Sequence, residues 1–150
     1  MKIHDSIAQV LKSKNIDKVL SISPEDTVYD ALTLMAEHDV GALLVIADGE
    51  LSGILSERDY ARKGVLLGHP SRETKVSQMM TSPVIFVTPN HTVDECLELM
   101  TRHRFRHLPV VDRDKVTGVV SIGDLVKWVI SRQDRAIQEL EGYVTGAYPA

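Results

Sequence analysis

The stretch that decides the fold is Gly118-Val119-Val120-Ser121-Ile122-Gly123-Asp124, which ends a strand, turns and starts a helix. Sixty-five positions earlier the chain repeats this pattern as Gly53-Ile54-Leu55-Ser56-Glu57-Arg58-Asp59. Each copy brings backbone N–H groups, a hydroxyl and a carboxylate to the start of a helix, which suits a ligand with a phosphate and a ribose. The Ser-x-x-Asp spacing is also typical of a capping box, in which both side chains only satisfy backbone N–H groups of the helix. One copy alone favours the capping box, so the setting of the two copies has to decide between the readings.

The repeat extends well beyond these two motifs. Residues 19–65 and 84–130 align without a gap at a constant shift of 65, and 13 of the 47 aligned positions are identical. The identical residues lie at turns, helix caps and core positions alike. In the first copy they are Val19, Pro24, Thr27, Val28, Leu32, Leu34, Met35, His38, Leu43, Val45, Gly53, Ser56 and Asp59. The chain therefore contains an internal duplication.

Each copy predicts the element order β-α-β-β-α. Hydrophobic patterning and turn residues predict strands over residues 19–22, 43–47 and 51–55, and again over 84–87, 108–111 and 116–120. Helices are expected from Thr27 to about residue 38, from Ser56 to Val65, and after the capping residues Thr92 and Ser121. One such unit leaves a face of its sheet uncovered, so two units are expected to pack sheet to sheet about a pseudo-twofold axis. The predicted fold class is α/β (α+β), with an N-terminal helical segment over residues 5–15, a short helix over 75–80 and an extended C-terminal helix.

Composition narrows the class of protein. The chain has 150 residues, of which 43% are hydrophobic and 25% charged, as in ordinary globular proteins. Its formal net charge of −4 argues against a general nucleic-acid binder. The single cysteine, Cys96, excludes an internal disulfide, suits a reducing compartment and is expected in the core. Without a secretory leader or an apolar run long enough to span a bilayer, the sequence predicts a cytoplasmic protein with no membrane partner.

The two units resemble tandem cystathionine β-synthase (CBS) domains, the pair often called a Bateman module, of the stand-alone type. The resemblance rests on Ser23-Pro24-x-x-Thr27-Val28, Thr88-Pro89-x-x-Thr92-Val93, Leu108-Pro109-Val110-Val111-Asp112 and the two Gly-x-x-Ser-x-x-Asp endings. It implies CBS domain 1 over residues 16–67, CBS domain 2 over 76–131 and a helical extension over 132–150. It also implies regulatory binding of an adenosine compound such as AMP, ADP, ATP, NAD or S-adenosylmethionine.

The resemblance further implies which residues bind this ligand, because family sites combine elements of both repeats. Asp124 and Asp59 would hold the ribose, and Ser121 and Ser56 would lie on the phosphate side. One cleft would contain Asp124 and Ser121 with Leu20, Val40, Gly41, Val119, Arg106 and His107. The reciprocal cleft would contain Asp59 and Ser56 with Ile54, Arg58, Ile85, Phe105 and the backbone at Arg106 and Ala42; Met80 is a further candidate contact. Arg106 and His107 would bind phosphate, whereas the equivalent Gly41 and Ala42 carry no charge.

Three classes of function follow, of which the first is favoured. The first is a non-catalytic regulatory module that senses an adenine nucleotide in the clefts and modulates a partner protein that the sequence does not identify. The second is an interaction or scaffold protein with vestigial clefts, and the third is an enzyme acting on a nucleotide. The sequence shows no catalytic triad, metal-ligand cluster or Walker loop, so no catalytic residue, metal site or catalytic cofactor is expected. A hydrophobic stripe from Ile122 to Val144 predicts a homodimer through these helices.

Overall fold

The computed structural model describes residues 3–14 and 19–145. The chain divides into two compact units, each assembled from separate stretches of sequence. Unit 1 comprises Met1–Asn15, Pro89–Leu108 and Val120–Ala150, and unit 2 comprises Ile16–Thr88 and Pro109–Val119. The parts of the predicted N-terminal helix, CBS domain 1 and helical extension that fall on residues 15–18 and 146–150 lie outside the described residues.

Unit 2 contains the elements of the first repeat. Strands β1 (Ser21–Ile22), β2 (Ala42–Ala47) and β3 (Glu50–Ser56) form a sheet in the order β1-β2-β3, with β1 parallel and β3 antiparallel to β2. Asp48 and Gly49 join β2 to β3 with positive φ angles of 52° and 80°, as a tight hairpin turn requires. The predicted hairpin is thus confirmed.

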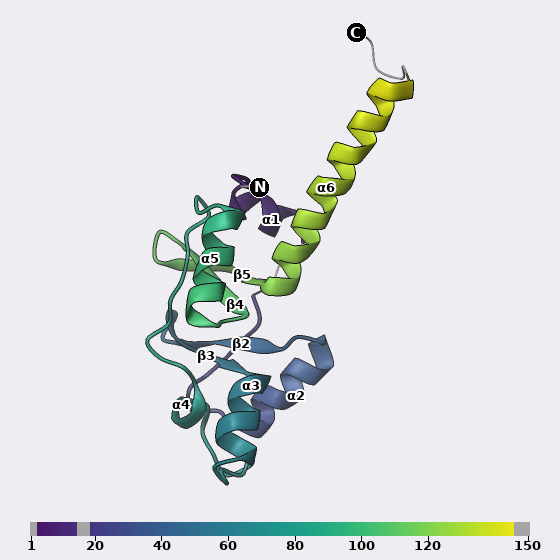
Figure 1. Cartoon of the computed structure of the whole chain (residues 1–150). Helices are drawn as coiled ribbons and strands as arrows, with labels where there is room; N and C mark the ends of the chain where they lie inside the picture. The colour runs from purple at the N-terminus through teal and green to yellow at the C-terminus, as the bar shows by residue number, and fades with distance from the viewer. Residues whose placement is uncertain (1–2, 15–18, 146–150) are drawn as a thin grey trace. The chain divides into compact units, whose positions relative to one another are not determined.

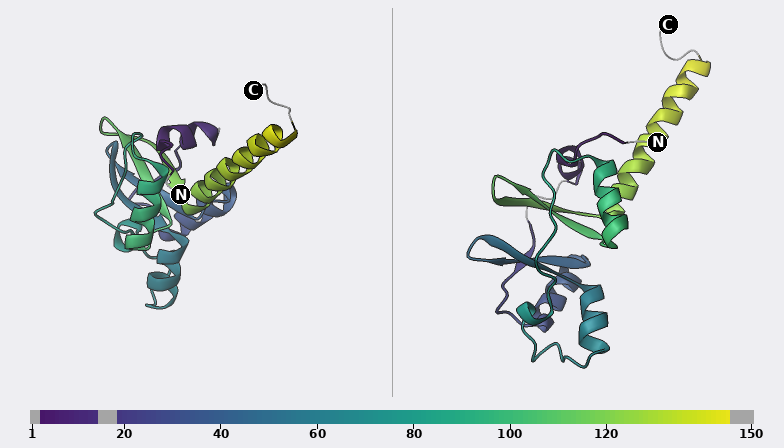
Figure 2. Two further views of the ribbon diagram at one scale, coloured as in Figure 1. Left: turned by 45° about the horizontal axis from the view of Figure 1, so that its top comes forward. Right: turned by 60° about the vertical axis from the view of Figure 1, so that its left-hand side comes forward.

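Helices cover one face of this sheet (Figures 1 and 2). They are α2 (Val28–His38), α3 (Glu57–Asp59), the π-helical η1 (Tyr60–Val65) and α4 (Val76–Met79). The core between sheet and helices consists of fully buried residues: Val28, Ala31, Met35, Leu43, Val45, Leu55, Val76 and Met79. The end of β3, where the Ser56 motif lies, therefore adjoins this buried core.

Unit 1 is largely helical. Helices α1 (Ile7–Ser13) and α5 (Val93–His103) pack against α6 (Ile122–Thr145), which extends well past both (Figure 1). Strands β4 (His107–Asp112) and β5 (Lys115–Ser121) form a two-stranded sheet; the ends next to α5 and α6 belong to unit 1, and the rest, Pro109–Val119, belongs to unit 2. The observed fold is therefore mixed α/β, with two small sheets and a long C-terminal helix, as the sequence predicted.

Two predicted elements differ in the structure. The strand expected over residues 84–87 is reduced to one bridge between Val87 and Val110, because Pro83 and Pro89 bracket a segment too short to form a ladder. The helix expected from Ser56 to Val65 is α-helical only to Asp59 and then widens into η1. The wider turns run on through hydrogen bonds from Leu66 N–H to Ala61 O and from His69 N–H to Gly64 O.

Candidate functional site

The Asp124 motif joins the end of β5 to the start of α6. The Ser121 N–H donates to Asp124 Oδ2 at 2.8 Å, and the Asp124 N–H donates back to Ser121 Oγ at 3.1 Å. The Ile122 N–H donates to Arg106 O at 2.8 Å, which ties the turn to the segment before β4. These bonds hold the Asp124 carboxylate in one place.

A lysine from outside the motif reaches this carboxylate. Lys14, which follows α1, places its Nζ 2.8 Å from Asp124 Oδ2, and the two side chains are only 23% and 20% exposed. Burial would raise the pKa of Asp124, but the hydrogen bonds from Lys14 and Ser121 outweigh it, so the pKa of Asp124 is lowered. The carboxylate is therefore ionised at neutral pH and already has a cation beside it.

Arg106 and His107 belong to the same unit as this pair. His107 is half-buried at the start of β4, and Arg106 is exposed just before it. Burial lowers the pKa of His107; Asp124 opposes this effect, and Lys14 and Arg106 add to it. At pH 7 His107 is therefore neutral and able to donate a hydrogen bond without contributing a charge.

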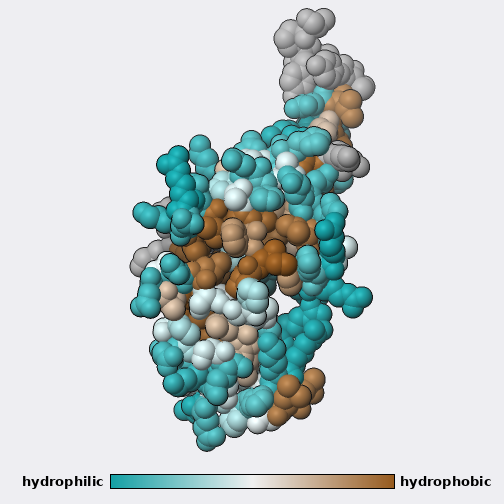
Figure 3. Space-filling model, turned by 90° about the vertical axis from the view of Figure 1, so that its left-hand side faces the viewer, coloured by the Kyte–Doolittle hydropathy of each residue, from teal (hydrophilic) through white to brown (hydrophobic). Residues whose placement is uncertain are grey.

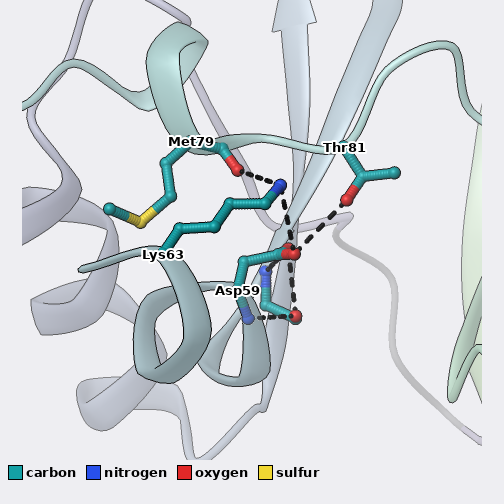
Figure 4. A network of polar contacts seen from close by, with 5 residues as sticks. Asp59, Lys63, Met79 and Thr81 are labelled. Carbon is teal, nitrogen blue, oxygen red and sulfur yellow. Dashed lines mark hydrogen bonds and ion pairs between the residues drawn. The ribbon is translucent and has the colours of Figure 1, made fainter. Parts of the chain in front are cut away.

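The Asp59 motif repeats this arrangement at the end of β3 (Figure 4). The Ser56 N–H donates to Asp59 Oδ2 at 2.9 Å, and the Asp59 N–H donates to Ser56 Oγ at 3.1 Å. Ser56 Oγ also lies 3.0 Å from Asp59 Oδ2 as a donor. The Glu57 N–H donates to Gly41 O at 3.0 Å, which is the counterpart of the bond from Ile122 to Arg106 O.

The side chains that contact the Asp59 carboxylate from outside its motif are Thr81 and Lys63, whereas Asp124 is contacted by Lys14. Thr81 Oγ1 donates to Asp59 Oδ1 at 3.3 Å, and Lys63 Nζ lies 3.6 Å from the same oxygen. Lys63 Nζ also donates to Met79 O at 3.0 Å, so its position is fixed at two points (Figure 4). The cation on Asp59 thus comes from η1, four residues after the end of α3, and it also donates to a backbone carbonyl.

Met80 and Thr81 press against the strand that leads into this motif. Ile54 and Thr81 exchange backbone hydrogen bonds of 3.1 and 2.8 Å. A Cβ added at Gly53 would lie 2.5 Å from Met80 Sδ and 3.1 Å from Thr81 O. Gly53 therefore has to be glycine for this segment to approach β3.

The remaining predicted residues have these positions. Leu20, Val40 and Met80 are partly buried against the core of unit 2, and Ile54, Phe105 and Val119 are half-buried. Ile85 and Arg58 are exposed, and the Phe105 ring stacks on His103 with centroids 5.2 Å apart. Predicted sites that combine residues of both units, such as Asp124 with Leu20, Val40 and Gly41, stay predictions.

Sequence analysis missed Lys14, Lys63 and Thr81. Lys63 had a usable signal, because a lysine four residues after an aspartate on a helix faces it. Thr81 and Lys14 had none: Thr81 is brought in by a two-residue bridge to β3, and Lys14 is separated from Asp124 by 110 positions. The ion pair observed at Asp59 is with Lys63, and the predicted role of Arg58 in ligand binding stays a prediction.

Other expected features can be placed as well. Cys96 is fully buried, as predicted for a core residue, and burial raises the pKa of its thiol to about 12. Within residues 3–14 and 19–145 no group of three or more His, Cys, Asp or Glu side chains is arranged to hold a metal ion. In the same part of the chain, no helix combines the length and hydrophobicity needed to cross a bilayer.

Comparison with known proteins identifies the family. The CBS domain model matches residues 7–65 and 76–131. The chain is 42% identical over 151 residues to CBS domain-containing protein CBSX3, mitochondrial, of Arabidopsis thaliana, covering 95% of this chain and 73% of that protein.

Two solved structures show the same fold. A CBS-domain protein of Burkholderia ambifaria MC40-6, whose name proposes a role in signal transduction, is 48% identical with a TM-score of 0.82, covering 85% of this chain and 96% of that one. The CBS domain pair of protein MJ0100, in complex with 5′-methylthioadenosine and S-adenosyl-L-methionine, is 19% identical with a TM-score of 0.75, covering 87% and 99% of the two chains. This chain contains two CBS domains in tandem and belongs to the CBS domain family.

Proposed function

We propose that this protein is a non-catalytic regulatory module that binds an adenine nucleotide through its Ser-x-x-Asp motifs. The observation that carries the proposal is that both motifs hold a carboxylate in the same way. Each aspartate is fixed by the N–H of its serine, faces a lysine ammonium, and keeps an exposed fraction of 20% (Asp124) or 17% (Asp59). A fixed carboxylate that solvent can reach is suited to accept hydrogen bonds from the two hydroxyls of a ribose.

A capping box alone does not explain the lysine that lies beside each aspartate. A capping box requires the serine and the aspartate, and it needs no cation on the carboxylate. Both aspartates nevertheless have one, although the two lysines come from unrelated places in the sequence. The MJ0100 pair binds adenosyl compounds. An adenosine compound such as AMP, ADP, ATP or NAD is therefore the ligand class proposed for this chain.

Thermal unfolding with AMP, ADP, ATP and NAD tests the proposal. A ligand at 100 times its dissociation constant adds about 2.7 kcal/mol to the free energy of unfolding, which is a large shift in melting temperature. The matched control is the double variant Asp59→Ala/Asp124→Ala, in which the shift should disappear. If none of the four compounds shifts the wild-type protein, the scaffold function becomes the better account.

We further propose that the protein forms a homodimer through α6. This helix exposes five large hydrophobic side chains, with exposed fractions between 40% and 66%: Ile122, Val126, Ile130, Ile137 and Leu140. Figure 3 shows that hydrophobic residues also gather in a band at the surface of another face of the molecule. Exposed apolar stripes of this kind are typical of protein interfaces.

Light scattering at micromolar concentration measures the assembly directly. The expected mass is that of a dimer, and truncation after Ser131 should shift it toward the monomer. A monomeric wild-type protein would remove the claim. The regulated partner protein and the predicted cytoplasmic location stay predictions, and the Arabidopsis relative carries the word mitochondrial in its name.

A further inference from the structure

Helix α6 extends past the helices that it packs against (Figures 1 and 2). Its first turns are packed on one side, where Leu125 is fully buried and Trp128 Nε1 donates to Asp5 Oδ2 at 2.8 Å. Over residues 130–141, in contrast, every residue is exposed. Because a short stretch of helix without tertiary packing is only marginally stable in water, this part of α6 is expected to pack against a partner.

The side chains that α6 exposes repeat at the spacing of a coiled coil. One row of residues, 46% to 66% exposed where they are hydrophobic, follows alternating intervals of four and three positions: Val126, Ile130, Gln133, Ile137 and Leu140. This is the a/d pattern of a heptad repeat, in which the two isoleucines occupy a positions and the other three residues occupy d positions. We call this row the seam of α6.

We propose that the seam pairs with the seam of a second copy in a parallel, two-stranded coiled coil. This inference deepens the proposed homodimer and rests on it. Isoleucine at a positions with leucine at d positions favours two strands in parallel coiled coils. The same row of side chains meets in both copies, as a twofold interface requires. Because Asp124 lies in the first turn of α6, parallel pairing places the two Asp124 motifs at the same end of the coiled coil.

Gln133 decides the direction of pairing. In a parallel pair it faces Gln133 of the second copy, and two side-chain amides can donate to and accept from each other. In an antiparallel pair a positions face d positions, so Gln133 would face Ile130 or Ile137. Each copy would then bury an amide without a hydrogen-bond partner, which is costly.

The charges beside the seam are compatible with a second copy. Lys127, Asp134 and Glu141 lie on one flank of the seam, and the other flank carries Val129 and Ala136. Parallel pairing sets the charged flank of each helix against the uncharged flank of the other, so like charges do not meet. Antiparallel pairing would set Asp134 against its own copy and would gain only exposed ion pairs, which stabilise little. The buried amides therefore outweigh the ion pairs.

Disulfide cross-linking of introduced cysteines tests the direction and the register. Cys96 is fully buried, so it does not compete with a cysteine in the seam. Ile137→Cys and Leu140→Cys each lie opposite themselves in the parallel pair, close enough for a disulfide, and each should be cross-linked by mild oxidation in most of the protein. The matched control is Gln138→Cys, which is exposed but lies outside the seam and should remain uncross-linked.

Light scattering of the reduced variants and of the wild-type protein completes this test. A wild-type dimer in which neither seam variant cross-links, or in which Gln138→Cys cross-links as well as they do, would overturn the coiled coil and leave the homodimer standing. A monomeric wild-type protein would overturn both. Either result leaves the proposed nucleotide binding untouched, because that is measured separately with the ligand.

A second variant tests the role of Gln133 without a cysteine. Gln133→Leu should tighten the dimer by roughly tenfold or more, because a polar residue in the seam specifies the register at a cost in stability. Gln138→Leu makes the same change outside the seam and should leave the dissociation constant of the dimer unchanged. Equal dissociation constants for Gln133→Leu and the wild-type protein, measured by analytical ultracentrifugation, would show that Gln133 lies outside the interface.

Discussion

Replacing Asp124 with alanine should weaken AMP binding more than the same change at Asp59. The lost contact is a charge-assisted hydrogen bond to the ribose, which contributes about 1.5–3 kcal/mol. Part of this loss is offset, because the variant no longer has to separate Asp124 from Lys14, a partly exposed pair for which about 1 kcal/mol is an upper value. The net loss is therefore about 0.5–3 kcal/mol, or roughly 2- to 150-fold in affinity.

The two sites should differ because their phosphate sides differ. Lys14, Arg106 and His107 lie in the unit that contains Asp124, whereas the counterparts of Arg106 and His107 in the first repeat are Gly41 and Ala42. The Asp124 site is thus expected to account for the tighter step of a titration. Asp59→Ala should leave that step within about twofold of wild type.

Isothermal titration of both variants with AMP measures this difference, with thermal melts as a check that each variant is folded. The expected result is loss of the tight step in Asp124→Ala and its retention in Asp59→Ala. If Asp59→Ala alone abolishes tight binding, the phosphate has been assigned to the wrong motif.

Three further results are expected. Arg106→Ala should weaken AMP roughly tenfold or more and leave adenosine unchanged, because Arg106 would contact only the phosphate; calorimetry showing equal losses would contradict this role. Gly53→Ala should lower the free energy of unfolding in urea by about 1–3 kcal/mol, because the new Cβ would lie 2.5 Å from Met80 Sδ. The control Gly123→Ala, whose Cβ would meet nothing closer than 3.5 Å, should be neutral or stabilising, and similar values for both variants would refute the packing argument. The pKa of Asp124 is lowered from 3.8, so its ionisation stabilises the folded state above that pH, and this contribution is lost as pH falls through the folded pKa. Asp124→Asn should therefore lose less stability than wild type between pH 5 and 3 in urea titrations, and identical acid limbs would show that the carboxylate contributes nothing.

Much of this fold could be predicted because local signals and the duplication agree. Thr27 and Thr92 cap α2 and α5 through side-chain bonds to the backbone three residues later, as their sequence spacing predicts. The strand expected over residues 84–87 does not form, although its apolar residues fit a strand pattern. Two of these residues are not buried by a neighbouring element: Ile85 is 36% exposed and Phe86 51%. A short hydrophobic run carries no information about whether a neighbouring strand is available.

The candidate site was predictable only within each motif. The spacing of Ser121 and Asp124 is enough to predict their reciprocal hydrogen bonds, because both lie in one helical turn. The cation on Asp124 depends on where α1 packs, and the period of hydrophobic residues in a seven-residue helix does not contain that information. The ion pair between Lys14 and Asp124 is therefore a contact that the sequence could not predict.

The two motifs obtain their lysines by different routes. The position in α6 that corresponds to Lys63 is occupied by Trp128, so Asp124 has no lysine four residues further along its own helix. Trp128 instead donates its indole N–H to Asp5, which also pairs with Arg132 Nε at 3.2 Å. These contacts fasten the segment ahead of α1 to α6, and the end of α1 then presents Lys14 to Asp124. Trp128, which stands where the first repeat has Lys63, thus helps to anchor the helix that presents Lys14 to Asp124.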